Sequence, residues 1–145
     1  MKILWTDGSA IPNPGRGGWA VIEQQSDGTG RPVKWGCGAN TTNIRMEAQA
    51  IIAAIKYAGE EGCEIHTDSQ FWVKVLTEWA DGWRARGWKK RSGAIENLDL
   101  VKKLYELYHQ YPVKMVWVRG HVGTKLNEMA DEWADKARNK GESVI

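Results

Sequence analysis

The sequence has few cysteines, no long apolar run and little net charge, and each shortage excludes a class of protein. Its two cysteines, Cys37 and Cys63, are far apart and form no C-x-x-C pair, so neither a disulfide framework nor a zinc site is indicated. Free thiols suit a reducing cytosol. The N-terminal apolar run is too short for a signal peptide, and no stretch approaches the ~20 residues that span a membrane. We therefore expect a soluble cytoplasmic protein without a membrane partner.

The length and charge leave the class of partner open. A net charge of +2 over 145 residues is too small to indicate a nucleic-acid partner by itself. A chain of this length is expected to form one domain, here 1–145, and to need no metal or disulfide to fold. No repeat, linker or second domain is visible, which favours a free-standing monomer. Tryptophan is abundant, with nine residues, and this side chain both fills cores and stacks on bases.

Hydrophobic periodicity predicts an α/β fold with a mixed sheet and helices packed on it. The glycine- and proline-rich segment 11–18 is expected to be a loop, but it lacks the Gly-Lys-Ser/Thr ending of a P-loop. A basic segment at 82–93 interrupts the helical pattern. We expect strands at 2–7, 19–25, 32–39, 64–68 and 113–118, and helices at 45–58, 69–81, 98–108 and 127–139.

Two aspartates follow strand-like runs. Asp7 precedes Gly8 and Ser9, and by itself this triplet is ordinary turn chemistry, in which the glycine lets the chain turn sharply. The pattern recurs in Thr67-Asp68, however, and two strand-end aspartates in one small domain suggest a shared site. Rigid strands also hold a catalytic carboxylate more precisely than loops do.

Helices offer further acids. Glu47 is expected in the first turn of a helix, where the helix dipole favours an anion. In the last helix Asp131 and Glu132 both border the expected buried face, and periodicity does not choose between them.

A cluster of such acids has one clear physical use. Mg²⁺ prefers oxygen ligands and is held by a few carboxylates together with water and substrate phosphate. Two ions about 3.5–4 Å apart can activate a water and stabilise a leaving oxygen. Crowded carboxylates without a cation would repel one another and raise one another's pKa. If the acids converge, a divalent metal is therefore expected.

The motifs together resemble type 1 ribonuclease H of the bacterial kind, from about residue 3 to residue 139. Each motif is weak singly, but five in register are highly specific. They are Trp5-Thr6-Asp7-Gly8-Ser9, Thr41-Thr42-Asn43 with Arg45-Met46-Glu47, Thr67-Asp68-Ser69-Gln70, Gly120-His121-Val122-Gly123, and Asn127-Glu128 with Ala130-Asp131.

This resemblance implies a five-stranded mixed sheet with helices on both faces and a specific activity. The family cleaves the RNA strand of RNA–DNA hybrids with two Mg²⁺ ions, for which Mn²⁺ can substitute, and leaves 5′-phosphate and 3′-hydroxyl ends. It implies that His121 assists proton transfer or product release. Many relatives carry a second asparagine where this chain has Ile44, so one hydrogen bond to substrate is expected to be missing. The metal ligands carried over by motif are Asp7, Glu47, Asp68 and Asp131.

Basic and aromatic residues alternate in the segment after the second helix. Five cations within eight residues, with no acid between them, are unusual for a solvated surface and suit phosphate contacts. In the family this segment is a protrusion that holds the DNA strand. The residues are Arg84, Arg86, Lys89, Lys90 and Arg91, interleaved with Trp79, Trp83 and Trp88.

Short polar side chains beside the expected site suit a hybrid's minor groove. Asn13, Asn43 and Gln70 could contact base edges and 2′-hydroxyls. Thr42, helped by Arg45, resembles the family's DNA-phosphate pocket, although Arg45 could instead pair with a neighbouring acid. Two rival functions differ in class: a hybrid-binding module without catalysis, and a DNA nuclease or resolvase of the same superfamily. The first would need a lost acid, and the basic protrusion and Thr-Thr-Asn segment argue against the second.

Overall fold

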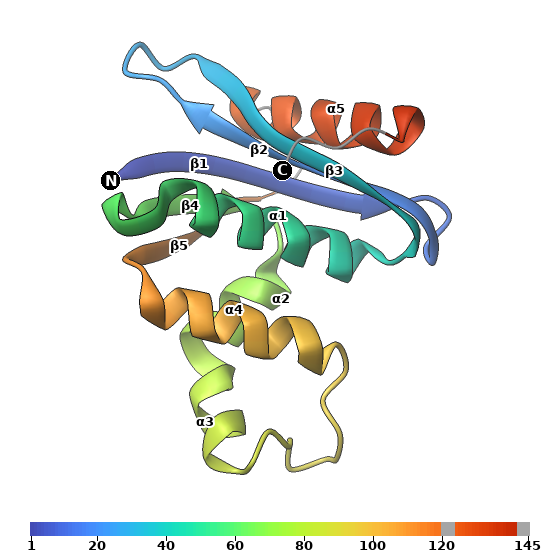
Figure 1. Cartoon of the computed structure of the whole chain (residues 1–145), viewed down its shortest axis with the longest axis vertical. Helices are drawn as coiled ribbons and strands as arrows, with labels where there is room; N and C mark the ends of the chain where they lie inside the picture. The colour runs from blue at the N-terminus through green and yellow to red at the C-terminus, as the bar shows by residue number, and fades with distance from the viewer. Residues whose placement is uncertain (120–123, 142–145) are drawn as a thin grey trace.

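The computed structural model describes residues 1–119 and 124–141, which fold around one five-stranded sheet of order β3-β2-β1-β4-β5 (Figure 1). The first three strands form an antiparallel meander, and β1, β4 and β5 run parallel. The predicted mixed sheet is therefore confirmed. The strands are β1 (Lys2–Ala10), β2 (Gly15–Gln24), β3 (Gly30–Thr41), β4 (Cys63–Thr67) and β5 (Val113–Trp117).

Helices cover both faces of the sheet. Figure 1 shows α1 and α4 on one face, α5 on the other, and α3 with the segment after it projecting away from the sheet. No helix in the described ranges is both long and apolar enough to cross a membrane. The helices are α1 (Asn43–Ala58), α2 (Gln70–Lys74), α3 (Ala80–Ala85), α4 (Leu98–Gln110) and α5 (Lys125–Lys140), with a 3-10 turn at Gly59–Glu61 and a π-helical turn at Val75–Trp79.

Three expectations about element boundaries are wrong, and the first is the loop expected at 11–18, because β2 already begins at Gly15. We expected the first strand to end at Asp7 with a turn at Gly8, but β1 continues to Ala10. Gly8 serves close packing instead, because a Cβ there would collide with the backbone of Met46 and Glu47 in α1. The expected break after residue 81 is also misplaced, because the helical path continues through the π-helical turn and α3 to Ala85.

The main core lies between the sheet and helices α1 and α4. The predicted leucine stripe of α4 is buried there, and Thr42 caps α1 by accepting a hydrogen bond from the Arg45 amide at 3.2 Å. A smaller cluster, built around Trp5, Ile22 and Leu126, lies under α5. A Cβ at Gly18 of β2 would collide with the backbone of α5, so glycine lets this helix lie close to the sheet.

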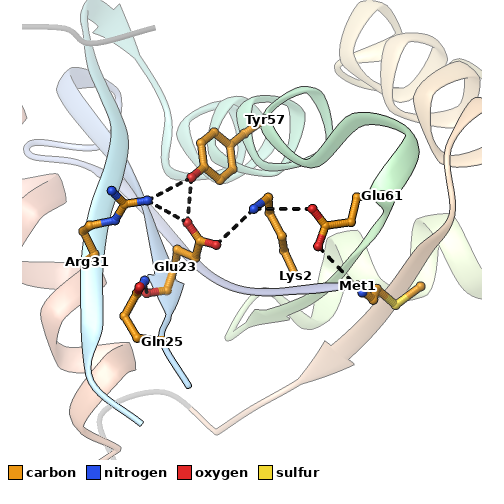
Figure 2. Close-up of polar contacts among 7 residues, drawn as sticks. All are labelled: Met1, Lys2, Glu23, Gln25, Arg31, Tyr57 and Glu61. Carbon is orange, nitrogen blue, oxygen red and sulfur yellow. Dashed lines mark hydrogen bonds and ion pairs between the residues drawn. The ribbon is translucent and has the colours of Figure 1, made fainter. Parts of the chain in front are cut away.

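A polar network ties the start of β1 to β2, β3 and the end of α1 (Figure 2). The Glu23 carboxylate accepts hydrogen bonds from the Tyr57 hydroxyl at 2.6 Å, from Arg31 at 3.1 Å and from Lys2 at 3.2 Å. Burial acts to raise the pKa of Glu23, but these three hydrogen bonds outweigh it and lower the pKa. Lys2 also lies 3.5 Å from Glu61. The network fixes the end of the sheet away from Asp7.

Candidate active site

Four acids predicted from the motifs come from four different elements. Asp7 lies on β1 and Asp68 directly follows β4, and these two strands are parallel neighbours with Thr6 opposite Thr67. The register therefore places the two aspartates side by side. Asp131 on α5 reaches Asp7 from one face of the sheet, and Glu47 on α1 reaches Asp68 from the other.

The electrostatics show how closely these acids interact. Burial, the charge of Asp68 and a hydrogen bond with Asp131 raise the pKa of Asp7 to about 9. Burial raises the pKa of Glu47 to about 7, with a contribution from the Asp68 charge and an opposing one from a hydrogen bond with Ser69. Both acids are thus held where negative charge is costly without a cation.

The tertiary structure separates the two acids that periodicity left equivalent. Asp131 is half-buried and hydrogen-bonded to Asp7. Glu132 points into solvent, where it pairs with Lys136 at 3.2 Å. Of the two, Asp131 is the one that joins the acid cluster.

Glu47 does not lie where we expected on its helix. Because α1 begins at Asn43, Glu47 falls beyond the first turn, which contains no acid. The helix dipole therefore does not explain its position, since the dipole acts within the first turn. The close approach of β1 at Gly8 brings this part of α1 next to Asp7.

The donor set suits a hard divalent cation. All four side chains offer carboxylate oxygens, the ligands that Mg²⁺ prefers, and their mutual repulsion favours a cation between them. Within 1–119 and 124–141, no three acidic, histidine or cysteine side chains are arranged to hold a metal ion by themselves. Mg²⁺ is commonly bound by one or two carboxylates with water and substrate phosphates, so a complete protein cage is not required.

Two asparagines join the β1–β2 turn to the start of α1. The Asn13 side-chain oxygen accepts a hydrogen bond from the Asn43 amide at 3.1 Å, and the Asn43 side-chain oxygen accepts one from the Ala10 amide at 2.7 Å. With these oxygens engaged, the side-chain NH₂ groups remain as donors for a ligand. Gln70, the first residue of α2, is exposed.

A hollow of about 590 Å³ with a mixed polar and apolar lining adjoins these asparagines and contains two residues that the sequence did not single out. Thr42 and Asn13 line it together with Glu96 and Asn97. Asn97 has a left-handed backbone, with φ 57°, directly before α4. An asparagine immediately before an apolar helical pattern was the available signal.

Arg45 pairs with a neighbouring acid, which is the second of the two roles that the sequence allowed. Its guanidinium donates to Asp99 at 2.8 and 3.1 Å and to the Asn97 side chain at 3.2 Å. This side chain therefore joins the starts of α1 and α4.

An apolar hollow of about 340 Å³ lies between α1, α2 and the projecting segment. Ile44, Phe71, Trp79, Trp83 and Ile95 line it, and Lys90 and Glu96 stand at its edge with Asn97. Trp79 is exposed, whereas Trp83 packs against the core. Trp88 packs edge-on against Tyr105 of α4, so its ring supports the segment.

The predicted basic cluster lies on the projecting segment. Four of its five cations are exposed and Lys90 is half-buried. Among the described residues, no acid lies within ion-pair distance of any of them. They are thus available to an external anion. His121 and its flanking glycines lie outside the described residues.

Comparisons with known proteins agree with this arrangement. The family model RNase H matches residues 1–139. A Ribonuclease H of Aromatoleum aromaticum is 42% identical over 147 residues, covering 97% of this chain and 95% of that protein. A Ribonuclease H of Methylorubrum extorquens is 42% identical over 139 residues, and the match covers 95% of this chain but 60% of that protein.

A solved structure is similar across almost the whole chain. LC9-RNase H1, described as a type 1 RNase H with the type 2 active-site motif, has a TM-score of 0.77 and 29% sequence identity, covering 99% of this chain and 75% of that one. The family match, the identity and the shared fold lead to the same conclusion. The chain belongs to the RNase H family, a family of endoribonucleases.

Proposed function

We propose that this protein is an endonuclease that hydrolyses the RNA strand of RNA–DNA hybrids. The observation that carries the proposal is the buried carboxylate of Asp7, hydrogen-bonded to Asp131 and repelled by Asp68. Such an arrangement is costly for folding and is expected where the acids serve chemistry. The membership of the RNase H family supplies the reaction class.

Asp7, Glu47, Asp68 and Asp131 are proposed to hold two Mg²⁺ ions, for which Mn²⁺ can substitute. When bound, the ions would activate a water and stabilise the leaving oxygen of an in-line displacement at phosphorus. Ser69, whose side chain bonds Glu47, would keep this carboxylate oriented. His121 is proposed to move a proton or to help product leave, and the products would carry 5′-phosphate and 3′-hydroxyl ends.

The two strands would be recognised by different parts of the surface. The NH₂ groups of Asn13 and Asn43, and exposed Gln70, would contact minor-groove acceptors and 2′-hydroxyls. The hollow at Thr42 would take a phosphate of the DNA strand.

The projecting segment would hold the DNA strand further along. Trp79 and Trp83 would contact its sugars, and Trp88 would support the segment. The phosphates would meet Arg84, Arg86, Lys89, Lys90 and Arg91.

The test is cleavage of a labelled RNA–DNA hybrid beside RNA–RNA and DNA–DNA duplexes, with and without Mg²⁺. We expect cleavage of the hybrid alone and only with the metal. Binding without cleavage would favour a hybrid-binding module, and cleavage of the DNA duplex would favour a DNA nuclease. The single domain, the monomeric state and the cytoplasmic location stay predictions, and size-exclusion chromatography with light scattering tests the second.

A further inference from the structure

An exposed tryptophan stands beside the acid cluster and has no role in the proposed reaction so far. Trp117 is the last residue of β5, and its side chain is 44% exposed. Val113 and Met115, four and two residues earlier on the same strand, pack against the main core. The apolar side of β5 therefore extends beyond the part that the core covers, and the Trp117 indole at its end is exposed to solvent.

The backbone around Trp117 is firmly held. Trp117 lies opposite Thr67 in the parallel ladder, and the Val118 amide donates to the Thr67 carbonyl at 2.9 Å. These bonds fix the indole beside the residue that follows Thr67, which is Asp68. The exposure of the ring thus does not come from a loosely attached strand end.

The indole also contacts Asp68 directly. Its Nε1–H donates a hydrogen bond to the Asp68 carbonyl oxygen at 3.3 Å. Asp68 lies between the end of β4 and Ser69, the N-cap of α2, and its carbonyl also accepts a hydrogen bond from the Gln70 amide at 3.1 Å. The polar edge of the ring is therefore used to position the Asp68 peptide, while the apolar face remains available.

We propose that Trp117 is a positioning and substrate-contacting residue, which holds the Asp68 main chain and packs its indole face against a ribose of the cleaved strand. The position of Trp117 beside the acids and the chemistry of its ring both indicate a ribose as the group that it contacts. A strand whose phosphate lies at Asp7 and Asp68 must pass its sugars over the adjacent surface, and an aromatic face contacts sugar and base carbons without sequence preference. The inference rests on the proposed function.

Two substitutions separate the two roles. Trp117→Phe keeps an aromatic face but removes the N–H, so kcat should fall while KM stays within about twofold of the wild-type value. Trp117→Ala removes both, so KM for hybrid should rise about fivefold or more, as for loss of an aromatic contact to nucleic acid. Trp35→Phe, on the far side of the sheet beside Trp133, is the control and should change neither constant.

A binding measurement keeps the test independent of catalysis and of the alanine variant's folding. The fluorescence of Trp117 is obtained by subtracting the spectrum of Trp117→Phe from that of the wild type, and without divalent metal it should fall when hybrid binds. The fluorescence of Trp35, obtained in the same way from Trp35→Phe, should not fall. Wild-type KM in Trp117→Ala, or an unquenched difference, would overturn the inference even when the wild type cleaves hybrid. Failure of the wild type to cleave hybrid would instead count against the proposed function.

Discussion

At the scale of single residues, the buried acids are the least favourable feature of this protein. Asp7 is 8% exposed, and the charges of Asp68 and Asp131 both act on it. Its raised pKa means that the folded protein binds a proton that the unfolded chain releases above pH 4 or so. Between these pKa values the group therefore makes the metal-free protein less stable as pH rises.

Replacing Asp7 by asparagine should abolish hybrid cleavage and stabilise the metal-free protein. The amide keeps the shape of the side chain and stays neutral, whereas at pH 8 the Asp7 carboxyl must either take up a proton on folding or be charged beside Asp68 and Asp131. We expect the Tm at pH 8 to rise by about 3–8 °C, the shift that 1–2 kcal/mol produces in a domain of this size. Thermal melts in EDTA and a hybrid cleavage assay with Mg²⁺ measure the two effects.

Glu132→Gln provides the matched control. Glu132 lies on the same helix as Asp131 but is exposed and paired with Lys136. It should change neither the Tm of the metal-free protein nor cleavage. Full activity of Asp7→Asn at ordinary Mg²⁺ would contradict the assignment of the metal site.

At the scale of elements, the helical path from α2 to α3 carries the basic segment away from the sheet. A π-helical turn, Val75–Trp79, joins the two helices, and such turns are frequent at functional sites. It leaves Trp79 exposed at the apolar hollow, while Val75 and Leu76 stay in the core. The segment that follows is anchored on α4 through Trp88 and Tyr105.

Changing Lys89, Lys90 and Arg91 to alanine should weaken hybrid binding and flatten its salt dependence. Each lost phosphate contact removes roughly 0.7–0.9 from the slope of log K against log salt. The rate at saturating hybrid should change little, because these residues are remote from the acids in sequence and element. Fluorescence anisotropy over a range of salt concentrations gives the slope.

The control for this variant removes equal charge elsewhere. Lys56, Lys103 and Lys140 are exposed residues of α1, α4 and α5, and their replacement by alanine should leave the slope nearly unchanged. Equal slopes for the two triple variants would show that only total charge matters.

The Glu23 network predicts how stability depends on pH at the other end of the sheet. A lowered pKa stabilises the fold above the unfolded-state pKa, and this contribution is lost as pH falls through the folded-state pKa. Glu23→Gln should therefore cost about 1–2 kcal/mol at pH 7 and progressively less below about pH 4. Urea unfolding at several pH values measures the difference, and Glu61→Gln, whose side chain is 52% exposed, should cost little. A pH-independent cost would mean that packing, and not charge, dominates.

At the scale of the whole molecule, the surface offers two regions of different chemistry. Neutral amide and hydroxyl groups of Asn13, Thr42 and Asn43 lie where the β1–β2 turn meets the start of α1, and five cations lie on the projecting segment. Neutral donors suit the 2′-hydroxyls of RNA, whereas cations suit phosphates of either strand. A duplex bound across both surfaces would have its strands tested separately.

This division predicts that only the RNA strand of a hybrid is cut, with little sequence preference. Several 2′-hydroxyls would be read together, so a DNA duplex with one embedded ribonucleotide should be cut poorly or not at all. Gel analysis of substrates with one, two, three or four consecutive ribonucleotides measures the smallest number of ribonucleotides that cleavage requires. Efficient cleavage at a single ribonucleotide would contradict this prediction and would indicate the substrate specificity of another branch of the superfamily.

The order and type of most elements, and the residue types of the site, were predictable from the sequence. Alternating and helical periodicities located every strand and the four long helical stretches, because burial of one face imposes a period on the chain. The run Thr41-Thr42-Asn43 consists of residue types that favour a helix N-terminus, and the structure shows that Thr42 is the one that caps α1. The motifs also supplied the four acids and the basic segment.

The tertiary structure decided what depends on contacts between distant elements. The hydrophobic periodicity of the last helix defines its buried face only to within one residue, so it leaves Asp131 and Glu132 equivalent. The packing of α5 on Gly18 and the smaller core cluster sets the rotation of the helix, and this rotation turns Asp131 toward Asp7. The length of β1 depends on the approach of α1 at Gly8, which a local reading mistakes for a turn. The exposure of Trp117 depends on where the covering helices end, and no pattern within β5 records this. Local propensity thus determined the elements, and packing determined which side chains meet.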